Sequence, residues 1–228
     1  KWFYTGCGIQ ISTDTVHWKI RTVPFTNGGC CGRVTYGNSN WLVINGEYDS
    51  GAGRCTAAST DSIHWDLRTL GTNCERYLSG LAYGNSLFMA KMCNDVTVST
   101  DTIHWALRTV GSSLVSSERH YGIAYGNGLW ATVGNDHNGC FAASTDTIHW
   151  DLRTHGLLGW YIYQVSYANG YWFINGESCM SVSTDTIHWN KRECMSSPPT
   201  QCTPVVYNGD YYIYGGTNGR LAYRKNIV

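Results

Sequence analysis

A seven-residue sequence, Ser-Thr-Asp-x-x-His-Trp, occurs five times in this chain and constrains its fold more than any other feature. The copies lie at 12–18, 59–65, 99–105, 144–150 and 183–189, with successive offsets of 47, 40, 45 and 39 residues. In four copies, Ile-Arg-Thr or Leu-Arg-Thr follows one residue after the Trp. Self-similarity at a period of this size is typical of repeat architectures. We therefore predict that residues 1–228 form a single domain of repeats about 43 residues long.

A second pattern recurs between these copies. Alternating apolar stretches end in a Gly/Asn turn at 34–38, 81–85, 123–127, 165–169 and 205–209. Further apolar stretches follow at 41–44, 87–92, 129–133, 171–174 and 211–214. This order predicts two strands joined by a tight hairpin turn. A third short strand then enters each seven-residue copy and a fourth follows its Trp. We name these strands A, B, C and D in chain order.

Four antiparallel strands per repeat predict an all-β fold, the β-propeller of four-stranded blades. Small residues near the start of strand A suit the crowded centre of such a ring. The terminal repeats are incomplete: strands B, C and D are expected at 2–7, 9–13 and 18–22, and strands A, B and C at 204–208, 211–215 and 220–224. The resulting 22 strands favour six blades, the first without strand A and the last without strand D. Five blades with overhanging ends remain an alternative.

Charge argues against several classes of partner. Charged residues make up 14% of the chain and the formal net charge is zero. Nucleic-acid binders need a basic surface, so we expect no nucleic-acid partner. Because no apolar run approaches the roughly 18 residues of a membrane-spanning helix, we expect no membrane insertion.

Ten cysteines are irregularly spaced and include no Cys-x-x-Cys pair that would indicate zinc. We predict structural disulfides, and therefore a secreted protein. All ten fall in or beside the B–C and D–A connections, where disulfides would pin the loops. Pairs within one repeat, such as Cys31–Cys55 and Cys74–Cys93, are the simplest choice, although the connectivity stays open. The cysteines are Cys7, Cys30, Cys31, Cys55, Cys74, Cys93, Cys140, Cys179, Cys194 and Cys202.

The seven-residue sequence resembles a form, shorter by one residue, of the Asp-box (BNR repeat) of sialidase-like propellers. Residues 124–134 and 143–150 together look like repeats of secreted and phage-tail propeller proteins. The resemblance implies a turn between strands C and D, on the rim away from the ligand-binding face. An Asp in such a turn accepts backbone N–H groups, and a Trp buries its ring between blades. The residues concerned are Asp14, Trp18, Asp61, Trp65, Asp101, Trp105, Asp146, Trp150, Asp185 and Trp189.

Five Asp–His pairs could also suggest a catalytic or metal array. Identical copies around a ring cannot converge on one substrate, so we interpret the box as scaffold and predict neither catalytic residues nor a metal or cofactor. The arginines that follow each box are expected to be its structural partners. They are Arg21, Arg68, Arg108, Arg153 and Arg192.

The residues that break the repeat lie in the B–C and D–A connections. Carboxylates and amides recur after strand B, and aromatic residues with Arg or His recur before strand A. Carboxylate oxygens accept sugar hydroxyl protons, Arg donates hydrogen bonds, and an aromatic ring packs on the apolar face of a sugar. The candidate ligand-binding residues are Glu47, Tyr77, Asp95, Arg119, His120, Tyr121, Asp136, Trp160, Tyr161 and Glu177.

Three functions fit these features. The first is a multivalent lectin that resembles tachylectin-type and fungal propeller lectins and binds glycans or glycoproteins through repeated weak sites. The second is a non-catalytic extracellular interaction or structural module. The third is a sialidase-like glycosidase with carboxylates drawn from Glu47, Glu75, Glu118 and Glu177, but no Phe-Arg-Ile-Pro-type segment or unique arginine triad is found. A homo-oligomer in which a second chain completes the terminal blades is compatible with the sequence.

Overall fold

The computed structural model describes most of the repeated part of the chain. The described residues are 2–6, 8–14, 16–25, 31–45, 55–70, 78–92, 95–110, 122–134, 140–155, 157, 162–176, 179–193, 205–215 and 221–225. Their regular structure consists of β-strands throughout. Over these same ranges, no helix has the length and apolar character needed to cross a membrane.

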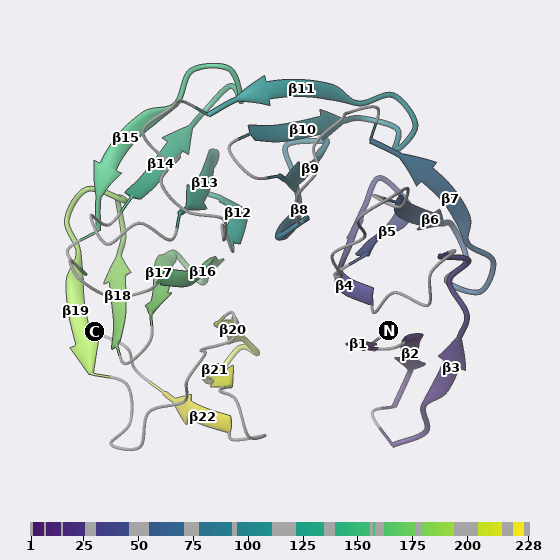
Figure 1. Cartoon of the computed structure of the whole chain (residues 1–228). Helices are drawn as coiled ribbons and strands as arrows, with labels where there is room; N and C mark the ends of the chain where they lie inside the picture. The colour runs from purple at the N-terminus through teal and green to yellow at the C-terminus, as the bar shows by residue number, and fades with distance from the viewer. Residues whose placement is uncertain are drawn as a thin grey trace. The chain divides into compact units, whose positions relative to one another are not determined.

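The strands form six antiparallel sheets, which Figure 1 shows in chain order. The first sheet contains β1 (Trp2–Gly6), β2 (Gly8–Ser12) and β3 (Lys19–Arg21). The second contains β4 (Cys31–Gly37), β5 (Asn40–Asn45), β6 (Cys55–Ser59) and β7 (Asp66–Thr69). The third contains β8 (Gly80–Gly84), β9 (Leu87–Lys91), β10 (Asp95–Ser99) and β11 (Ala106–Thr109). The fourth sheet contains β12 (Gly122–Gly126), β13 (Leu129–Val133), β14 (Cys140–Ser144) and β15 (Asp151–Thr154). The fifth contains β16 (Ile162–Ala168), β17 (Tyr171–Gly176), β18 (Cys179–Ser183) and β19 (Asn190–Glu193). The sixth contains β20 (Val206–Tyr207), β21 (Tyr212–Gly215) and β22 (Leu221–Arg224).

Each sheet follows the order that the repeats predict. The four middle sheets contain strands A, B, C and D side by side. The first sheet contains strands B, C and D, and the last contains A, B and C. The predicted all-β propeller of four-stranded antiparallel blades with incomplete terminal blades is confirmed. Because neighbouring strands are antiparallel, the A–B and C–D turns lie at one end of each sheet and the B–C and D–A connections lie at the other.

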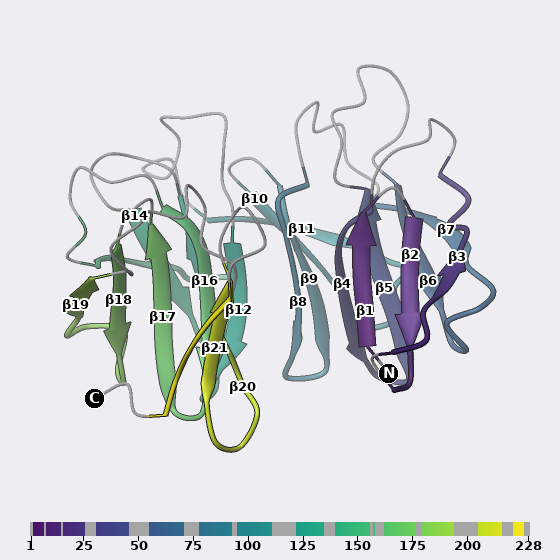
Figure 2. The same ribbon diagram turned by 90° about the horizontal axis from the view of Figure 1, so that it is seen from below.

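The A–B turns are tight because their central residues adopt left-handed backbone conformations. Asn38 and Ser39 have φ of 44° and 60°, and Asn127 and Gly128 have φ of 47° and 76°. Two successive residues with positive φ form the type I′ turn, whose twist matches that of a hairpin. In Figure 2 the hairpins β16–β17 and β20–β21 turn at the same end of their sheets.

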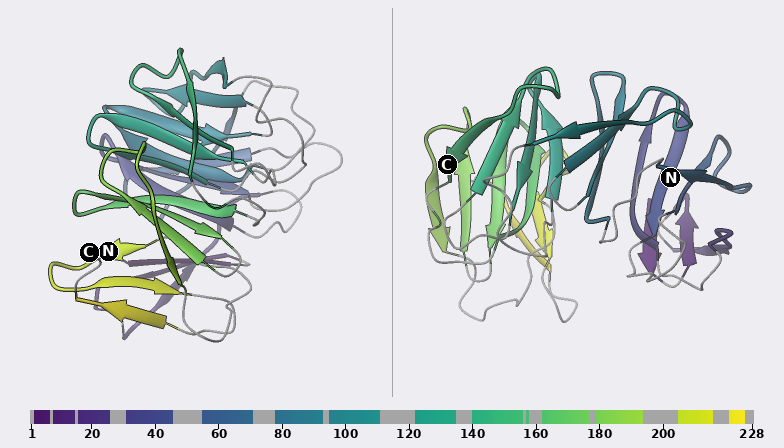
Figure 3. Two further views of the ribbon diagram at one scale, coloured as in Figure 1. Left: turned by 90° about the vertical axis from the view of Figure 1, so that its left-hand side faces the viewer. Right: turned by 45° about the horizontal axis from the view of Figure 1, so that its top comes forward.

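The described core consists of apolar clusters between successive sheets. The chain divides into two compact units, Lys1–Arg108 and Thr109–Val228. In the first unit, Leu42 and Ile44 face the third sheet while Val43 faces the first. In the second unit, the clusters join β12–β15 to β16–β19 and β16–β19 to β20–β22. Figure 3 shows the ribbons of these sheets in two further views. The second and fifth sheets therefore bury both faces, which explains their nearly continuous apolar strands.

Strands A of neighbouring sheets approach each other closely within each unit. A Cβ added at Gly122 would lie 2.6 Å from the backbone nitrogen of Val165 on the next strand A. At the other end of the strand, a Cβ added at Gly126 would lie 2.1 Å from Cγ of Tyr167. Since real Cβ atoms do not approach other atoms so closely, these positions require the small residues that the sequence predicted.

The strand register argues against one predicted disulfide pair. Cys31 on β4 is paired with Asn45 on β5, and Ile44 is paired with Thr56 on β6. The central strand β5 therefore separates Cys31 from Cys55. Two strand spacings of about 4.8 Å place their Cα atoms roughly 10 Å apart, whereas a disulfide spans less than about 7 Å. The backbone register therefore contradicts the pairing Cys31–Cys55, and the disulfides themselves stay a prediction.

Candidate functional site

The end of each sheet that was predicted to bind ligand is only partly described. Of the candidate ligand-binding residues, Asp95 is the one within the described ranges. The other nine lie outside them: Glu47, Tyr77, Arg119, His120, Tyr121, Asp136, Trp160, Tyr161 and Glu177. The side chains of all ten cysteines, and the pair Cys74–Cys93, also lie outside the described part.

Asp95 has a structural role that the sequence did not predict. It is the partly buried first residue of β10, and its carbonyl oxygen accepts a hydrogen bond of 2.9 Å from the N–H of Met92. This bond closes the B–C hairpin of the third sheet. The main chain of Asp95 therefore serves the turn.

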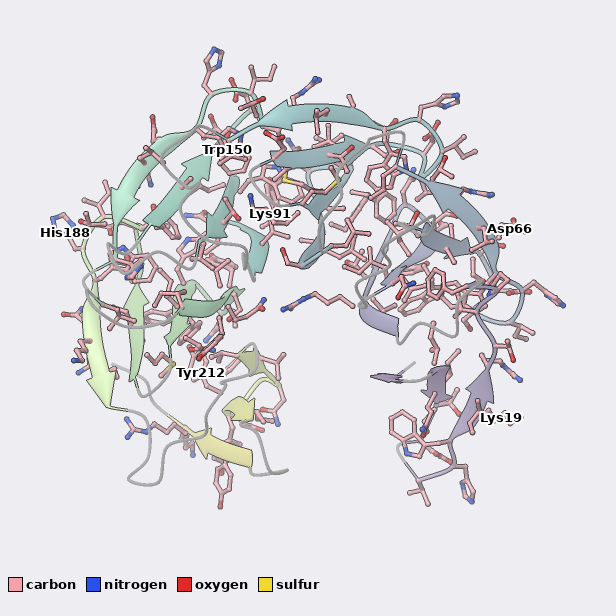
Figure 4. All side chains as sticks on the ribbon, viewed as in Figure 1. Lys19, Asp66, Lys91, Trp150, His188 and Tyr212 are labelled. Carbon is pink, nitrogen blue, oxygen red and sulfur yellow. The ribbon has the colours of Figure 1, made fainter. Side chains whose placement is uncertain are left out.

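Polar residues at the end of strand B are buried where the sequence suggested the start of a ligand rim. Asn175 is buried and Lys91 is fully buried at equivalent positions, where the second sheet has Ile44, and Asn45 is buried one position further along. Figure 4 shows Lys91 among the side chains beside β8 and β9. These residues belong to the interior of the blades, so a ligand site must lie further out along the connections.

The five boxes form turns between strands C and D, as predicted. In the fourth sheet, Ser144 Oγ accepts the N–H of Thr147 at 2.8 Å and donates to Asp146 Oδ1 at 3.2 Å. Asp146 Oδ1 also accepts the N–H groups of Ile148 and His149, both at 2.8 Å. Thr147 has a φ of 69°, which is unusual for a β-branched residue. The Ser and Asp oxygens thus stabilise a strained turn by accepting its N–H groups.

Each box also contains an exposed histidine–aspartate pair. The Nδ1–Oδ2 distance is 2.8 Å for His17 and Asp14 and 2.7 Å in the other four boxes. The hydrogen bond from the His149 ring, together with the N–H groups of His149 and Ile148, holds the pKa of the Asp146 carboxyl well below its usual value. Among the described residues, no three His, Cys, Asp or Glu side chains form a group that could hold a metal ion.

The tryptophans of the boxes do not share one environment. Trp65 is 7% exposed in the cluster between the first two sheets. Trp105 and Trp189 pack against the clusters that join their sheets to the preceding ones. Trp18 is 40% exposed. The prediction that the ring is buried between blades is confirmed for Trp65 and wrong for Trp18, whereas Trp105, Trp150 and Trp189 are partly buried.

The arginine after the fourth box links two sheets. Arg153 on β15 donates through Nη1 to Thr186 Oγ1, in the box of the next sheet. Nη2 of the same arginine lies 3.3 Å from Oδ2 of Asp151 on its own strand. In the same way, Nη2 of Arg68 lies 3.4 Å from Oδ2 of Asp66. The expectation that these arginines are structural partners of a box is confirmed for Arg153, whose partner is the box of the following repeat.

His155 is a buried residue that the sequence analysis missed. It is 0% exposed, and the equivalent positions hold Val23, Leu70 and Val110, which are also buried. Its Nδ1 accepts the N–H of Leu157 at 3.2 Å, and its Nε2 is buried without a hydrogen bond. Burial lowers the pKa of His155 to about 4. The signal in the sequence was a histidine at a position that is apolar in three other repeats.

An aromatic pair recurs across the A–B hairpins, and its first copy is unusually open. Tyr83 stacks against Phe88 and Tyr167 against Trp172, with ring centroids 4.7 and 4.9 Å apart. The rings of Tyr83 and Tyr167 also lie over a glycine on the preceding strand A. Tyr36, by contrast, is 51% exposed.

Comparison with known proteins places the chain by its fold. No family model matches it, and no curated protein matches it in sequence. It is similar in structure to a virginiamycin B lyase from Staphylococcus aureus, with a TM-score of 0.80 and 12% identity over 97% of this chain and 74% of the other. A streptogramin B lyase has a TM-score of 0.74 and 10% identity over 98% of this chain and 77% of the other. The structure of YCF48 bound to D1 peptide is also similar, with a TM-score of 0.68 and 10% identity over 98% of this chain and 74% of the other.

The likeness is one of fold. At these identities it does not carry over the activity of a lyase or the partner of YCF48. It shows that this arrangement of sheets serves both enzymes and a peptide-binding protein.

Proposed function

We propose that the chain is a non-catalytic, multivalent carbohydrate-binding protein that acts outside the cell. The observation that carries this proposal is the division of each repeat into two ends. The C–D turns repeat the same hydrogen bonds in all five boxes, whereas residues that break the repeat follow strands B and D, at the opposite end of the sheet. Repetition at one end and variation at the other is expected when a rigid scaffold presents binding loops.

The boxes support the non-catalytic part of the proposal. Five nearly identical histidine–aspartate pairs occupy equivalent turns, so each serves its own turn and none is distinguished as an acid, base or nucleophile. Catalysis needs several different groups that converge on one substrate. A sialidase-like glycosidase would have to build its active site from the connections at the other end of the sheets.

A glycan array probed with the oxidised protein tests the proposal. We expect binding to a narrow class of glycans without turnover in glycosidase and lyase assays of the same sample. Trp160→Ala and Glu177→Ala should weaken binding and leave the melting temperature nearly unchanged. Ser144→Ala, in a box at the other end of the sheet, is the matched control and should leave glycan binding unchanged. Turnover of any glycan would replace the proposal with an enzyme.

A polypeptide partner is the second candidate. The half-exposed Tyr36, which contacts Trp41 with ring centroids 4.4 Å apart, favours it because aromatic residues are enriched at protein interfaces. YCF48 bound to D1 peptide shows that a protein of this fold can hold a peptide. Absence of glycan binding and turnover, with capture of a defined extracellular protein, would favour this candidate.

A further inference from the structure

Strand D forms the outer edge of each sheet that contains it. In the second sheet this strand is β7 and in the fourth it is β15, and both sheets contain all four strands of a blade (Figure 1). Among the described strands, each of the two pairs on one side alone. The other side presents main-chain N–H and C=O groups that can pair with a strand of another chain.

The main chain of β7 is centred on Leu67 at this edge. The carbonyl of Arg68 faces the inner strand β6, because it accepts a hydrogen bond of 3.2 Å from Oγ1 of Thr56. Main-chain groups alternate in direction along an antiparallel strand, so those of Leu67 face outwards. The bond of 3.2 Å from Nη1 of Arg68 to the carbonyl of Leu67 agrees with this direction. Since the Leu67 side chain is also 38% exposed, a second strand can reach this residue.

The order Asp-Leu-Arg makes the edge complementary to itself. When two such strands pair antiparallel about the leucine, Asp66 of each copy lies opposite Arg68 of the other. The two leucines then form a hydrogen-bonded pair with Cα atoms about 5.5 Å apart, and each charge pair has its Cα atoms about 4.5 Å apart. Opposite charges in cross-strand pairs stabilise a sheet. Strand β15 has the same order, with Asp151, Leu152 and Arg153.

The charges on these two strands can exchange their present partners for those of a second copy. The side chains of Asp66 and Asp151 are 76% and 77% exposed. Each lies more than 3 Å from an arginine of its own strand, at 3.4 Å for Arg68 and 3.3 Å for Arg153. Exposed ion pairs of this kind contribute little to stability. Replacing them with pairs between two copies therefore costs little.

The other outer strands lack this complementarity. In β11, Ala106 takes the place of the aspartate. In β3, Lys19 takes that place and would face an arginine of the second copy. In β19, Lys191 takes the place of the leucine and would face itself. Lysine on an edge strand is a common protection against pairing. Two of the five D strands thus favour a second copy, β7 in the first unit and β15 in the second.

We propose that β7 and β15 are self-association edges, each of which pairs antiparallel with β7 or β15 of a second copy of this chain. Two like edges form a contact in which the same patch serves on both copies, as in an isologous two-fold interface. Because each chain has two such edges, association can continue beyond a pair. The inference does not rest on the proposed glycan binding, although association would multiply the sites on one particle.

Sedimentation equilibrium of the 228-residue protein at increasing concentration tests this inference. We expect the weight-average mass to rise above the 25.4 kDa of one chain. The double variant Leu67→Lys with Leu152→Lys should keep the mass of one chain at every concentration. Each single variant retains one edge and should stop at two chains. Both strands should accept lysine, because Lys191 occupies the equivalent position of β19.

Strand β11 provides the matched control and a test for gain of association. Leu107 is 48% exposed at the same position but has no aspartate before it, so Leu107→Lys should leave the association unchanged. Adding Ala106→Asp to the double variant should restore pairing, up to two chains, through β11. A single-chain mass for the unchanged protein would overturn the proposal, as would undiminished association of the double variant or equal loss with Leu107→Lys. The double variant keeps every residue proposed to bind glycans, so its glycan array distinguishes failure of the two proposals.

Discussion

The ring of Tyr83 lies directly over Gly37 on the strand A of the preceding sheet, so that a Cβ added at Gly37 would fall 2.1 Å from Cγ of the ring. We predict that Gly37→Val lowers the free energy of unfolding by about 1–3 kcal/mol, because the added side chain must displace the ring. Denaturant unfolding would measure the loss. In a Tyr83→Ala background the same change should cost much less, and equal costs in both backgrounds would show that the ring is not the obstacle.

The box tryptophans should differ in their contribution to stability. Trp65→Ala should cost about 3–5 kcal/mol, because the ring is buried between the first two sheets. Trp18→Ala removes a ring that is 40% exposed and should cost clearly less. Thermal unfolding of the two variants side by side checks this order. Equal losses would mean that Trp18 is as well covered in solution as Trp65.

The serine of a box should stabilise the turn through its buried oxygen. Ser144→Ala leaves the N–H of Thr147 without its 2.8 Å acceptor and should cost about 1 kcal/mol. Thr145→Ala, at the exposed neighbouring position, is the control and should change stability by less than about 0.5 kcal/mol. Urea unfolding at neutral pH resolves the difference. A larger effect at Thr145 would contradict the assignment of the cap to Ser144.

His155 should make the protein less stable in mild acid. Its pKa is about 4 when folded and 6.5 when exposed, so the unfolded chain binds more protons between these values. Stability is therefore complete above pH 6.5 and falls as the pH decreases towards 4, by roughly 3 kcal/mol in all. Charged residues are absent from five strands of the fourth and fifth sheets, namely β12, β13, β14, β16 and β17. In β15 the charged residues are Asp151 and Arg153.

His155→Leu should remove this dependence on pH, since Leu70 occupies the equivalent buried position. Melting temperatures of the two proteins from pH 7.5 to 4 provide the measurement. The box aspartates have lowered pKa values, so their contribution is present above their ordinary pKa of 3.8 and is lost below it, in both proteins. A variant that keeps the full loss between pH 6.5 and 4 would assign that loss to another group.

The sequence predicted the strands well because their signals are local. Alternating apolar residues, Asn-Gly turns and the five boxes each determine a short piece of backbone, and together they indicate antiparallel sheets with strands in order. The environment of Trp18 could not be predicted in this way, since the same seven residues leave Trp18 40% exposed and Trp65 only 7% exposed, and the cover over each ring comes from residues outside the box. Cys31 and Cys55 were paired by proximity in sequence, and the register then placed a whole strand between them.

The candidate site was less predictable for a related reason. Asp95 looked like a ligand residue because carboxylates and amides recur after strand B, yet its carbonyl closes a hairpin. Lys91 and His155 are polar residues in apolar surroundings, and a single repeat compared with its neighbours would have revealed both. Tyr36 and Tyr83 share the local sequence Tyr-Gly-Asn-Ser, yet Tyr36 is 51% exposed and Tyr83 is partly buried, so the local sequence does not determine how far the ring is covered.

The contact from Arg153 to Thr186 has a consequence for how such a chain can change its length. The fourth repeat donates this contact to the fifth and places Gly126 beneath Tyr167 of the fifth, as the second repeat places Gly37 beneath Tyr83 of the third. A duplication or deletion of one whole repeat therefore rejoins a forward surface to a matching rear surface and creates no foreign interface. Gene rearrangements by whole repeats are thus structurally neutral, whereas those that cut within a repeat must rebuild both contacts.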